Sequence, residues 1–214
     1  MIKKILKGLE KNISLLSIIA LPFMPPHLYA QGEQQITWLK SQKTSYGLVD
    51  SYKGDGKALS YTYDQALAII AFTEAKEFAL AQNVIQAMID LQNSDGSWFS
   101  SYNNVTGAVL ASVPINESLH SSAQYLKNFA KSNQNLDTNK DSGNISWMVM
   151  ALNYYETQTG DTQYFSAADK ALNFLDGRID HNSQHETYGS ITHSTDLPTA
   201  RSTEHCHDAY SAFF

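Results

Sequence analysis

The stretch Ser60-Tyr-Thr-Tyr-Asp64-Gln-Ala-Leu-Ala-Ile-Ile-Ala-Phe72 decides the fold, because hydrogen-bonding groups lead directly into a segment that is apolar on every face. Two further stretches share this layout, Gly143-Asn-Ile-Ser-Trp147-Met-Val-Met-Ala-Leu152 and Ser202-Thr-Glu204-His-Cys-His-Asp208-Ala-Tyr-Ser-Ala-Phe-Phe214. A helix that is apolar all round must be covered on both sides. We therefore expect three inner helices whose N-terminal ends share one rim.

Helices with a single apolar face separate these inner segments. In Lys76–Leu91 the apolar side chains recur at helical spacing, at Ala81, Val84, Ile85 and Met88. In Gln163–Asp176 the corresponding stripe is Tyr164, Ala168, Ala171, Leu172 and Leu175. The connections at 73–76 and 157–161 are short, so consecutive helices should be antiparallel. The pattern predicts an all-α fold of paired inner and outer helices.

Similar turns follow the outer helices. Leu91-Gln92-Asn-Ser-Asp-Gly96-Ser-Trp98 through Tyr102 parallels Leu39-Lys-Ser-Gln42 through Gly47-Leu-Val-Asp50-Ser-Tyr52, and Tyr188-Gly-Ser-Ile191 is a weaker echo. Repeats of this size bury their apolar faces only by stacking on one another. Residues 103–143 are the least regular, although Leu119, Ala123, Leu126 and Ala130 are spaced for one amphipathic helix.

The N-terminus is typical of an export signal. Four lysines precede or begin a short apolar core at 13–24, and Leu28-Tyr-Ala30 ends on a small residue. That core is shorter than the roughly 20 residues that cross a bilayer. We predict a signal peptide at 1–30, a partial α/α-toroid domain at 31–214, and a periplasmic or secreted protein without membrane contact after cleavage. A retained signal anchor is the alternative.

Composition narrows the choice of partner. The net charge of −6 argues against nucleic acid, whose binding proteins carry a basic face. Only 17% of residues are charged, while Tyr, Asn, Gln and Ser are abundant, which suits neutral ligands such as sugars. The single Cys206 excludes an internal disulfide and a cysteine-based zinc site. A free thiol at Cys206 could link two chains through a disulfide. Two chains could also associate through the apolar flanks that three hairpins leave open.

Three motifs of the chain are Leu-Gln-x3-Gly-x-Trp at Leu91–Trp98, Tyr-Thr-Tyr-Asp at Tyr61–Asp64, and Ser-Thr-Glu-His-x-x-Asp-Ala-Tyr at Ser202–Tyr210. With the alternation of inner and outer helices, they resemble bacterial α/α-toroid proteins of the six-hairpin glycosidase type. The third looks like a motif of one exported branch of that group, although Cys206 and His207 stand where its pattern has Asn and an aliphatic residue. The resemblance covers residues 36–214 and implies an incomplete (α/α) toroid of inner and outer antiparallel helix hairpins, with a carbohydrate-related activity.

The last helical pattern stops in its middle, at Phe213-Phe214. We therefore expect the chain to be an N-terminal portion of a longer protein. A compact half-array, or a dimer that closes on itself, is the alternative.

Three acids are candidates for glycoside hydrolysis, which needs one protonated and one ionised carboxyl beside the scissile bond. They are Glu204, Asp64 and Asp208. Glu204 and Asp208 are four residues apart and share one face of a helix. We expect Glu204 to be the acid or base and Asp64 its partner from another inner helix. Helix capping and favourable interaction with the helix dipole are the alternative roles.

Aromatic side chains near the rim are candidate sugar platforms, since each offers a flat apolar face with a polar edge. The predicted substrate-binding set is Tyr61, Tyr63, Trp98, Tyr102, Trp147, His205 and Tyr210. The alternative for an aromatic at a turn is core packing, and Trp98 in particular could wedge one hairpin against the next.

The run Glu204-His-Cys-His-Asp208 also raises the question of a metal. His205 and His207 are two residues apart, which aims them at opposite sides of a helix, whereas a shared ion needs residues four apart. In an extended segment they could converge with His181, His185 or His193. We predict no metal and no cofactor.

Together these features predict an exported carbohydrate-active protein with glycoside-hydrolase-like acid–base chemistry on an oligo- or polysaccharide, inactive if truncation has removed part of the site. One alternative is a non-catalytic helical-hairpin module that binds glycan or protein. Another is a terpene-cyclase-like toroid, although the acidic Asp-x-Asp-Asp signature of that class is absent.

Overall fold

The computed structural model describes residues 26–52, 59–103 and 139–214. The chain divides into two compact units, Met1–Lys40 and Ser41–Phe214. Of the first unit the structure describes helix α2 (Pro26–Ser41), which has Lys40 in its last turn, where a cation suits the helix dipole. The lysines and apolar core of the expected signal fall in 1–25, and the expected helix near Leu119 falls in 104–138, so both lie outside the described residues. Among the described helices none has the length and hydropathy to cross a membrane.

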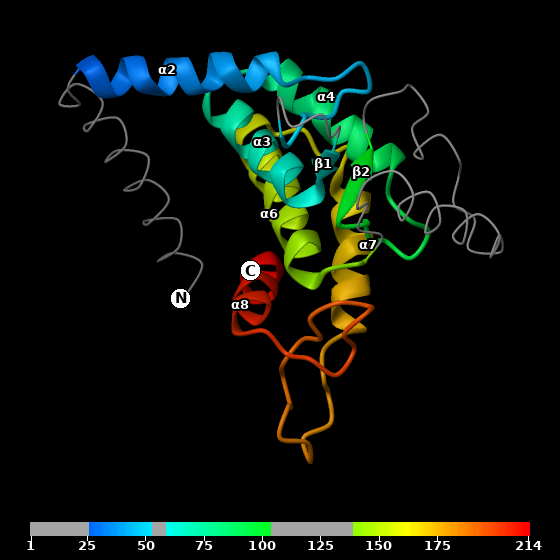
Figure 1. The fold of residues 1–214 in the computed structure, drawn as a ribbon. Coiled ribbons are helices and arrows are strands. Elements are labelled where there is room, and N and C mark those ends of the chain that lie inside the picture. The colour runs from blue at the N-terminus through cyan, green and yellow to red at the C-terminus, as the bar shows by residue number, and fades with distance from the viewer. Residues whose placement is uncertain (1–25, 53–58, 104–138) are drawn as a thin grey trace. The chain divides into compact units, whose positions relative to one another are not determined.

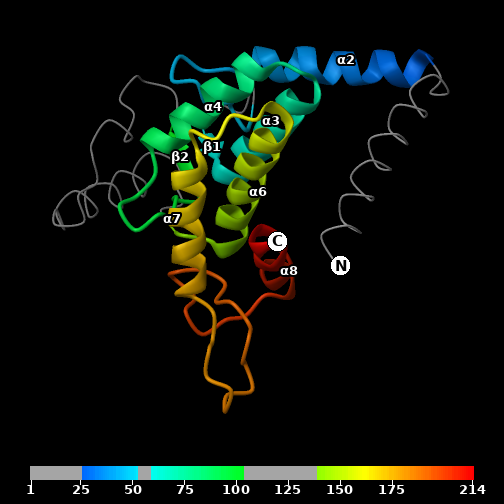
Figure 2. The same ribbon diagram turned by 180° about the vertical axis from the view of Figure 1, so that it is seen from behind.

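The second unit is built from helix hairpins. Its described helices are α3 (Thr62–Glu74), α4 (Phe78–Asp90), α6 (Ser142–Thr159), α7 (Phe165–Asp176) and α8 (Thr203–Phe213). Helix α6 packs against α3 and α8, while α4 and α7 lie to one side of α3 and α6 in both views (Figures 1 and 2). The described residues thus form the expected all-α fold, an incomplete (α/α) toroid of inner and outer antiparallel hairpins.

The apolar stripes form the core. In α4 the expected positions Ala81, Val84, Ile85 and Met88 are all fully buried. The predicted stripe of α7 is also buried, except for Leu172, which is only partly buried. Ala167 is buried as well, although it was not part of the predicted stripe. The apolar side chains of α6 are buried on several sides, as expected for an inner helix.

Helix α8 differs from the expectation for an inner helix. His205, Ala209 and Ala212 are buried, but Tyr210, Phe213 and Phe214 are exposed. The expectation of a helix covered on every face is therefore wrong for α8 within the described residues. The reason is that α8 packs mainly on α6, which covers one of its sides.

Two short strands are present that the helical pattern did not predict. Strand β1 (Leu59–Tyr61) pairs antiparallel with β2 (Ser101–Asn103), with Ser60 opposite Tyr102. Helix α3 begins at Thr62, directly after β1, and the Thr62 N–H donates to the Ser100 carbonyl. The segment before α6 is held in the same manner, since the Ser142 N–H donates to the His193 carbonyl. Extended segments therefore position the start of two inner helices.

The predicted glycine turns are confirmed. Gly47, Gly96 and Gly189 all have positive φ, at 86°, 87° and 79°. A β-carbon on Gly96 would lie 2.2 Å from the Lys170 carbonyl oxygen of α7, so only glycine allows this turn to approach that helix. The Gln92 side chain completes the contact by donating to the Gly96 and Ala167 carbonyls, at 2.9 and 2.8 Å.

The residue two positions after each of these glycines is buried. These residues are Val49, Trp98 and Ile191, none more than 2% exposed. The three turns therefore insert an equivalent side chain into the core, which explains the sequence echo as a packing repeat.

Candidate active site at the starts of the inner helices

The first turns of α3, α6 and α8 are connected through side chains. Tyr63 of α3 meets Trp147 of α6 edge to face, with ring centroids 5.4 Å apart and an interplanar angle of 82°. Trp147 in turn lies near the Asp208 carboxyl of α8 and lowers its pKa through a polar interaction. The three helices run in the same general direction in Figure 1. The expected rim is therefore present, and Trp147 lies at its centre.

Asp208 is the electrostatically perturbed acid of this rim. Burial raises the pKa of its carboxyl above the usual value of 3.8, and the negative charge of Glu204 raises it further. The interactions with His205 and with the Trp147 side chain act in the opposite direction. Glu204 is exposed in the first turn of the same helix. The site thus combines a partly buried carboxyl whose pKa is raised with an exposed carboxyl one helical turn away.

Asp64 lies in the first turn of α3, next to Tyr63, and is partly exposed. The N-cap of this helix is Tyr61, so Asp64 does not have the N-cap role considered as its alternative. Its position after the cap suits the helix dipole. Its role as the partner of Glu204 stays a prediction.

Trp98 and Tyr102 are core residues and not sugar platforms in the described structure. Their exposed fractions are 1% and 5%. The Trp98 indole N–H donates to the Met88 carbonyl at 2.6 Å, and the Tyr102 hydroxyl accepts from the Phe99 N–H at 3.0 Å. Burial also raises the pKa of the Tyr102 phenol. The predicted ligand contact is wrong for these two because their rings are covered by the protein.

Tyr61 and Tyr210 are two further predicted ligand contacts. Tyr61 is in β1, and its ring contacts Tyr52. Tyr210 comes two residues after Asp208, so its side chain leaves α8 about 200° away from that of Asp208. The Tyr210 ring contacts the ring of Phe214. Both rings therefore contact other aromatic side chains, and the predicted role of these two residues in ligand binding stays a prediction.

His205 lies in a buried cluster and not on the open rim. Its Nε2 is 3.6 Å from Asp141 Oδ1, and its ring centroid is 4.3 Å from that of His193. The ligand atoms of these three residues all lie within 4.8 Å of one another, which is close enough to hold a metal ion. The sequence reasoning missed Asp141, although an Asp immediately before an inner helix is a recognisable N-cap signal.

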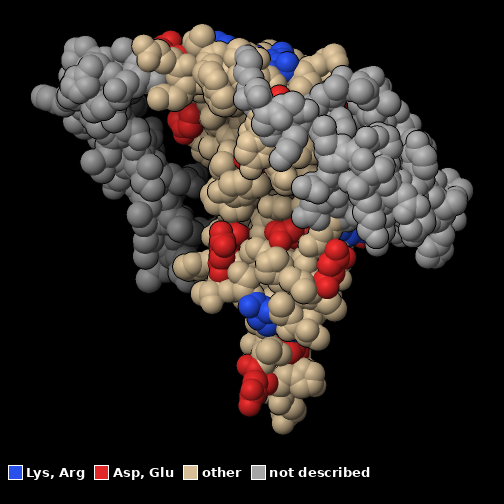
Figure 3. All heavy atoms as spheres, viewed as in Figure 1, with Lys and Arg blue, Asp and Glu red and all other residues tan. Residues whose placement is uncertain are grey.

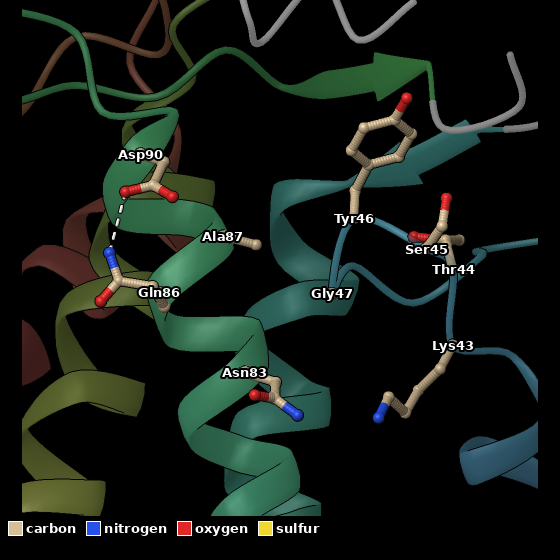
Figure 4. A pocket seen from close by; sticks show the side chains of 9 residues that line it. All are labelled: Lys43, Thr44, Ser45, Tyr46, Gly47, Asn83, Gln86, Ala87 and Asp90. Atoms are coloured by element: carbon tan, nitrogen blue, oxygen red, sulfur yellow. Dashed lines mark hydrogen bonds between the residues drawn. The ribbon is translucent and has the colours of Figure 1, made fainter. Parts of the chain in front are cut away.

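Charge is unevenly distributed around the rim. Figure 3 shows acidic side chains over α8, beside the start of α6 and over the C-terminal half of α7, with largely uncharged surface between them. A separate polar pocket of about 370 Å³ lies between the turn at 43–47 and α4. Asn83, Gln86 and Asp90 line its helical side, and Gln86 donates to Asp90 at 2.8 Å (Figure 4). None of the predicted site residues lines this pocket.

Comparison with known proteins gives partial structural matches. No family model matches the chain, and no curated protein matches it. An endoglucanase of glycosyl hydrolase family 8 from Klebsiella pneumoniae aligns with a TM-score of 0.47 and 17% identity, over 67% of this chain and 39% of that one. A GH8 endo-beta-1,4-glucanase from an Achatina fulica gut metagenomic library gives 0.48 and 20%, over 67% and 38%. An endo-beta-1,4-glucanase from Acetobacter xylinum gives 0.47 and 11%, over 76% and 43%. The chain thus spans about two fifths of the length of these three proteins.

Proposed function

We propose that this protein acts on a carbohydrate, hydrolysing glycosidic bonds of an oligo- or polysaccharide by acid–base catalysis. The observation that supports this function is the pairing of Asp208 with Glu204 beside the Trp147 indole. One carboxyl is partly desolvated and has a raised pKa, while the other is exposed on the same helix face. Glycoside hydrolysis requires one protonated and one ionised carboxyl, and a raised pKa at one of two neighbouring carboxyls favours such a division.

The proposed reaction uses Asp208 as the general acid. Its proton passes to the leaving-group oxygen as the bond from that oxygen to the anomeric carbon breaks. Glu204 is the proposed ionised partner, and Asp64 of α3 is the alternative for the same role. The partner either takes a proton from the water that adds to the anomeric carbon or attacks that carbon itself. Tyr63 is 38% exposed, and with Trp147 it would offer an aromatic surface to a sugar ring.

Glu204→Gln is expected to lower turnover by about 10²–10⁴-fold, because it removes the ionised carboxyl and leaves the side chain's shape almost unchanged. Release of reducing ends from a panel of neutral polysaccharides measures turnover, and binding to a glycan array measures affinity. Binding should be retained, since the substitution spares Tyr63 and Trp147.

Glu186→Gln is the matched control, because Glu186 is an exposed glutamate in the loop before Tyr188. This variant should keep full turnover. Unchanged turnover in Glu204→Gln would contradict the assignment. Glycan binding without any release of reducing ends by the natural sequence would favour a non-catalytic glycan-binding module.

We further propose that the protein is exported, with cleavage after Ala30. The charged start, the short apolar core and the small residue at position 30 support this proposal. N-terminal sequencing of protein recovered from the periplasm or the medium should give Gln31 as the first residue. Recovery of the chain in the membrane fraction with residues 1–30 still attached would favour a retained anchor.

A further inference from the structure

Three segments that are distant in the sequence bring side chains of metal-ligating types together near the start of α6. Asp141 directly precedes α6, His193 lies in the loop after α7, and His205 is in the first turns of α8. Asp141 Oδ1 is 3.6 Å from His205 Nε2, and Asp141 Oδ2 is 3.7 Å from His193 Nδ1. Both distances exceed hydrogen-bond length but lie within ion-pair range, and Asp141 Oδ1 also accepts from the Asn144 N–H at 2.9 Å.

The backbone sets the tautomer of His205. Its Nδ1 lies 3.2 Å from the His193 carbonyl, which can only accept, so Nδ1 carries the hydrogen. In the neutral imidazole Nε2 then presents its lone pair toward Asp141. A metal-ligating histidine commonly donates its other ring N–H to a backbone carbonyl in this way. The same carbonyl accepts from the Ser142 N–H, which fixes its position at the start of α6.

His193 supplies an independent observation. Its Nδ1 is buried yet has no hydrogen-bond partner, although the side chain as a whole is 35% exposed. An unpartnered buried nitrogen is costly unless something occupies the space that it faces. A cation bound among the two imidazoles and the carboxylate would give this nitrogen a partner.

The spacing suits a small divalent ion. Zinc held at 2.0–2.1 Å in a tetrahedral site places its ligands about 3.4 Å apart. The two histidines lie 3.6 and 3.7 Å from different oxygens of Asp141, and one ligand atom from each of the three residues lies within 4.8 Å of the others, so small side-chain shifts would complete the site. Two histidines and one carboxylate are also a ligand set that zinc accepts, with a fourth position left for water. A β-carbon on Gly143 would lie 2.8 Å from His205 Nε2, so glycine is needed to leave room beside this ligand.

The nearby charge of Arg178 provides the competing explanation. Burial lowers the pKa of its guanidinium, while the charge of Asp141 raises it, so the two groups interact. The Arg178 Nε, however, donates to Ser142 Oγ at 3.1 Å and not to Asp141. If the positive charge of Arg178 is enough to balance the negative charge of Asp141, the three residues will not bind zinc.

We propose that Asp141, His193 and His205 form a binding site for a zinc-type divalent cation that joins the start of α6, the loop after α7 and α8. This proposal departs from the sequence-based expectation that no metal is bound. Its three ligands do not include the proposed catalytic acids Asp208, Glu204 and Asp64, although the charges of His205 and Asp141 act on the carboxyl of Asp208. Binding would cross-link three elements and stabilise the folded chain.

The test is zinc binding to the full chain after removal of metals with a chelator. Isothermal titration should give one Zn²⁺ per chain, zinc should raise the Tm, and Co²⁺ should give the visible absorption of a low-coordinate site. His193→Ala should weaken binding by at least about 100-fold, more than the 10–100-fold typical of losing an outer-shell partner. Asp141→Asn should have a similar effect, and it keeps an N-cap oxygen for the Asn144 N–H.

His181→Ala is the matched control, because His181 also faces a carboxylate, that of Asp176 at 3.3 Å, but both side chains are largely exposed. This variant should bind zinc as the natural sequence does. Far-UV circular dichroism establishes that each variant is folded. Absence of zinc binding by the natural sequence overturns the proposal, as do unchanged affinities in folded His193→Ala and Asp141→Asn. Equal loss in His181→Ala would also overturn it.

Discussion

Replacing Trp98 by alanine is expected to lower the free energy of unfolding by about 3–5 kcal/mol. The ring is 1% exposed and lies in the core beneath the Gly96 turn, so its removal leaves a cavity. The indole N–H also donates to the Met88 carbonyl of α4, and that bond would be lost. Urea denaturation of the natural chain and the variant measures the difference.

Two further variants separate the causes of this loss. Trp98→Phe keeps most of the ring volume but loses the hydrogen bond, so the decrease should be smaller than in Trp98→Ala. Tyr188→Ala, in the third turn, removes an aromatic that is 61% exposed and should change stability by no more than about 0.5 kcal/mol. A Trp98→Ala variant as stable as the natural chain would show that this ring is not a core wedge.

Asp208→Asn is expected to lower turnover by about 10²–10⁴-fold and at the same time to stabilise the folded chain at neutral pH. An amide cannot donate a proton as a carboxylic acid does. The amide is also uncharged, so it removes both the burial of a negative charge and the repulsion from Glu204 that raise the pKa of Asp208. An acid that lowers stability but supports turnover is typical of a functional site.

The pH dependence follows from the direction of the pKa shift. Because the pKa of Asp208 is higher in the folded chain than in the unfolded chain, the ionised carboxyl disfavours folding. This destabilisation is absent below the unfolded pKa, grows as pH rises through the folded pKa, and is complete above it. The stability advantage of Asp208→Asn should therefore be present at neutral pH and disappear in acid.

Thermal unfolding of both proteins across this pH range is the measurement. The alkaline limb of turnover in the natural chain should reflect the same group, with activity falling as pH rises through the raised pKa of Asp208. Glu156→Gln, on the last turns of α6, is a control that should leave both the pH profile and turnover unchanged. A loss of stability in Asp208→Asn at neutral pH would instead indicate a structural role.

Much of the helical architecture could be predicted from local sequence. The stripe from Ala81 to Met88 predicted the buried face of α4, because helical spacing brings those residues to one side. The Asp95-Gly96 pair predicted a turn, and Gly96 has the positive φ that such a turn requires. Short connections likewise predicted the antiparallel hairpins.

The candidate site was predictable only in part. Asp208 and Glu204 could be placed on one face because they are one helical turn apart. The contact of Trp147 with Tyr63 and Asp208 joins three helices, and its geometry depends on how those helices pack. The sequence could place all three near a rim, but it could not identify which carboxyl would be desolvated.

The sequence by itself determined the helices, their apolar faces and the glycine turns, because those features depend on residues close together in the chain. The tertiary structure alone decided that Trp98 is covered, that β1 and β2 pair, and that Asp141 meets His193 and His205. Burial and convergence depend on side chains supplied by distant hairpins. Helical periodicity reports which face of a helix is apolar, but it contains no information about which other segment will cover that face.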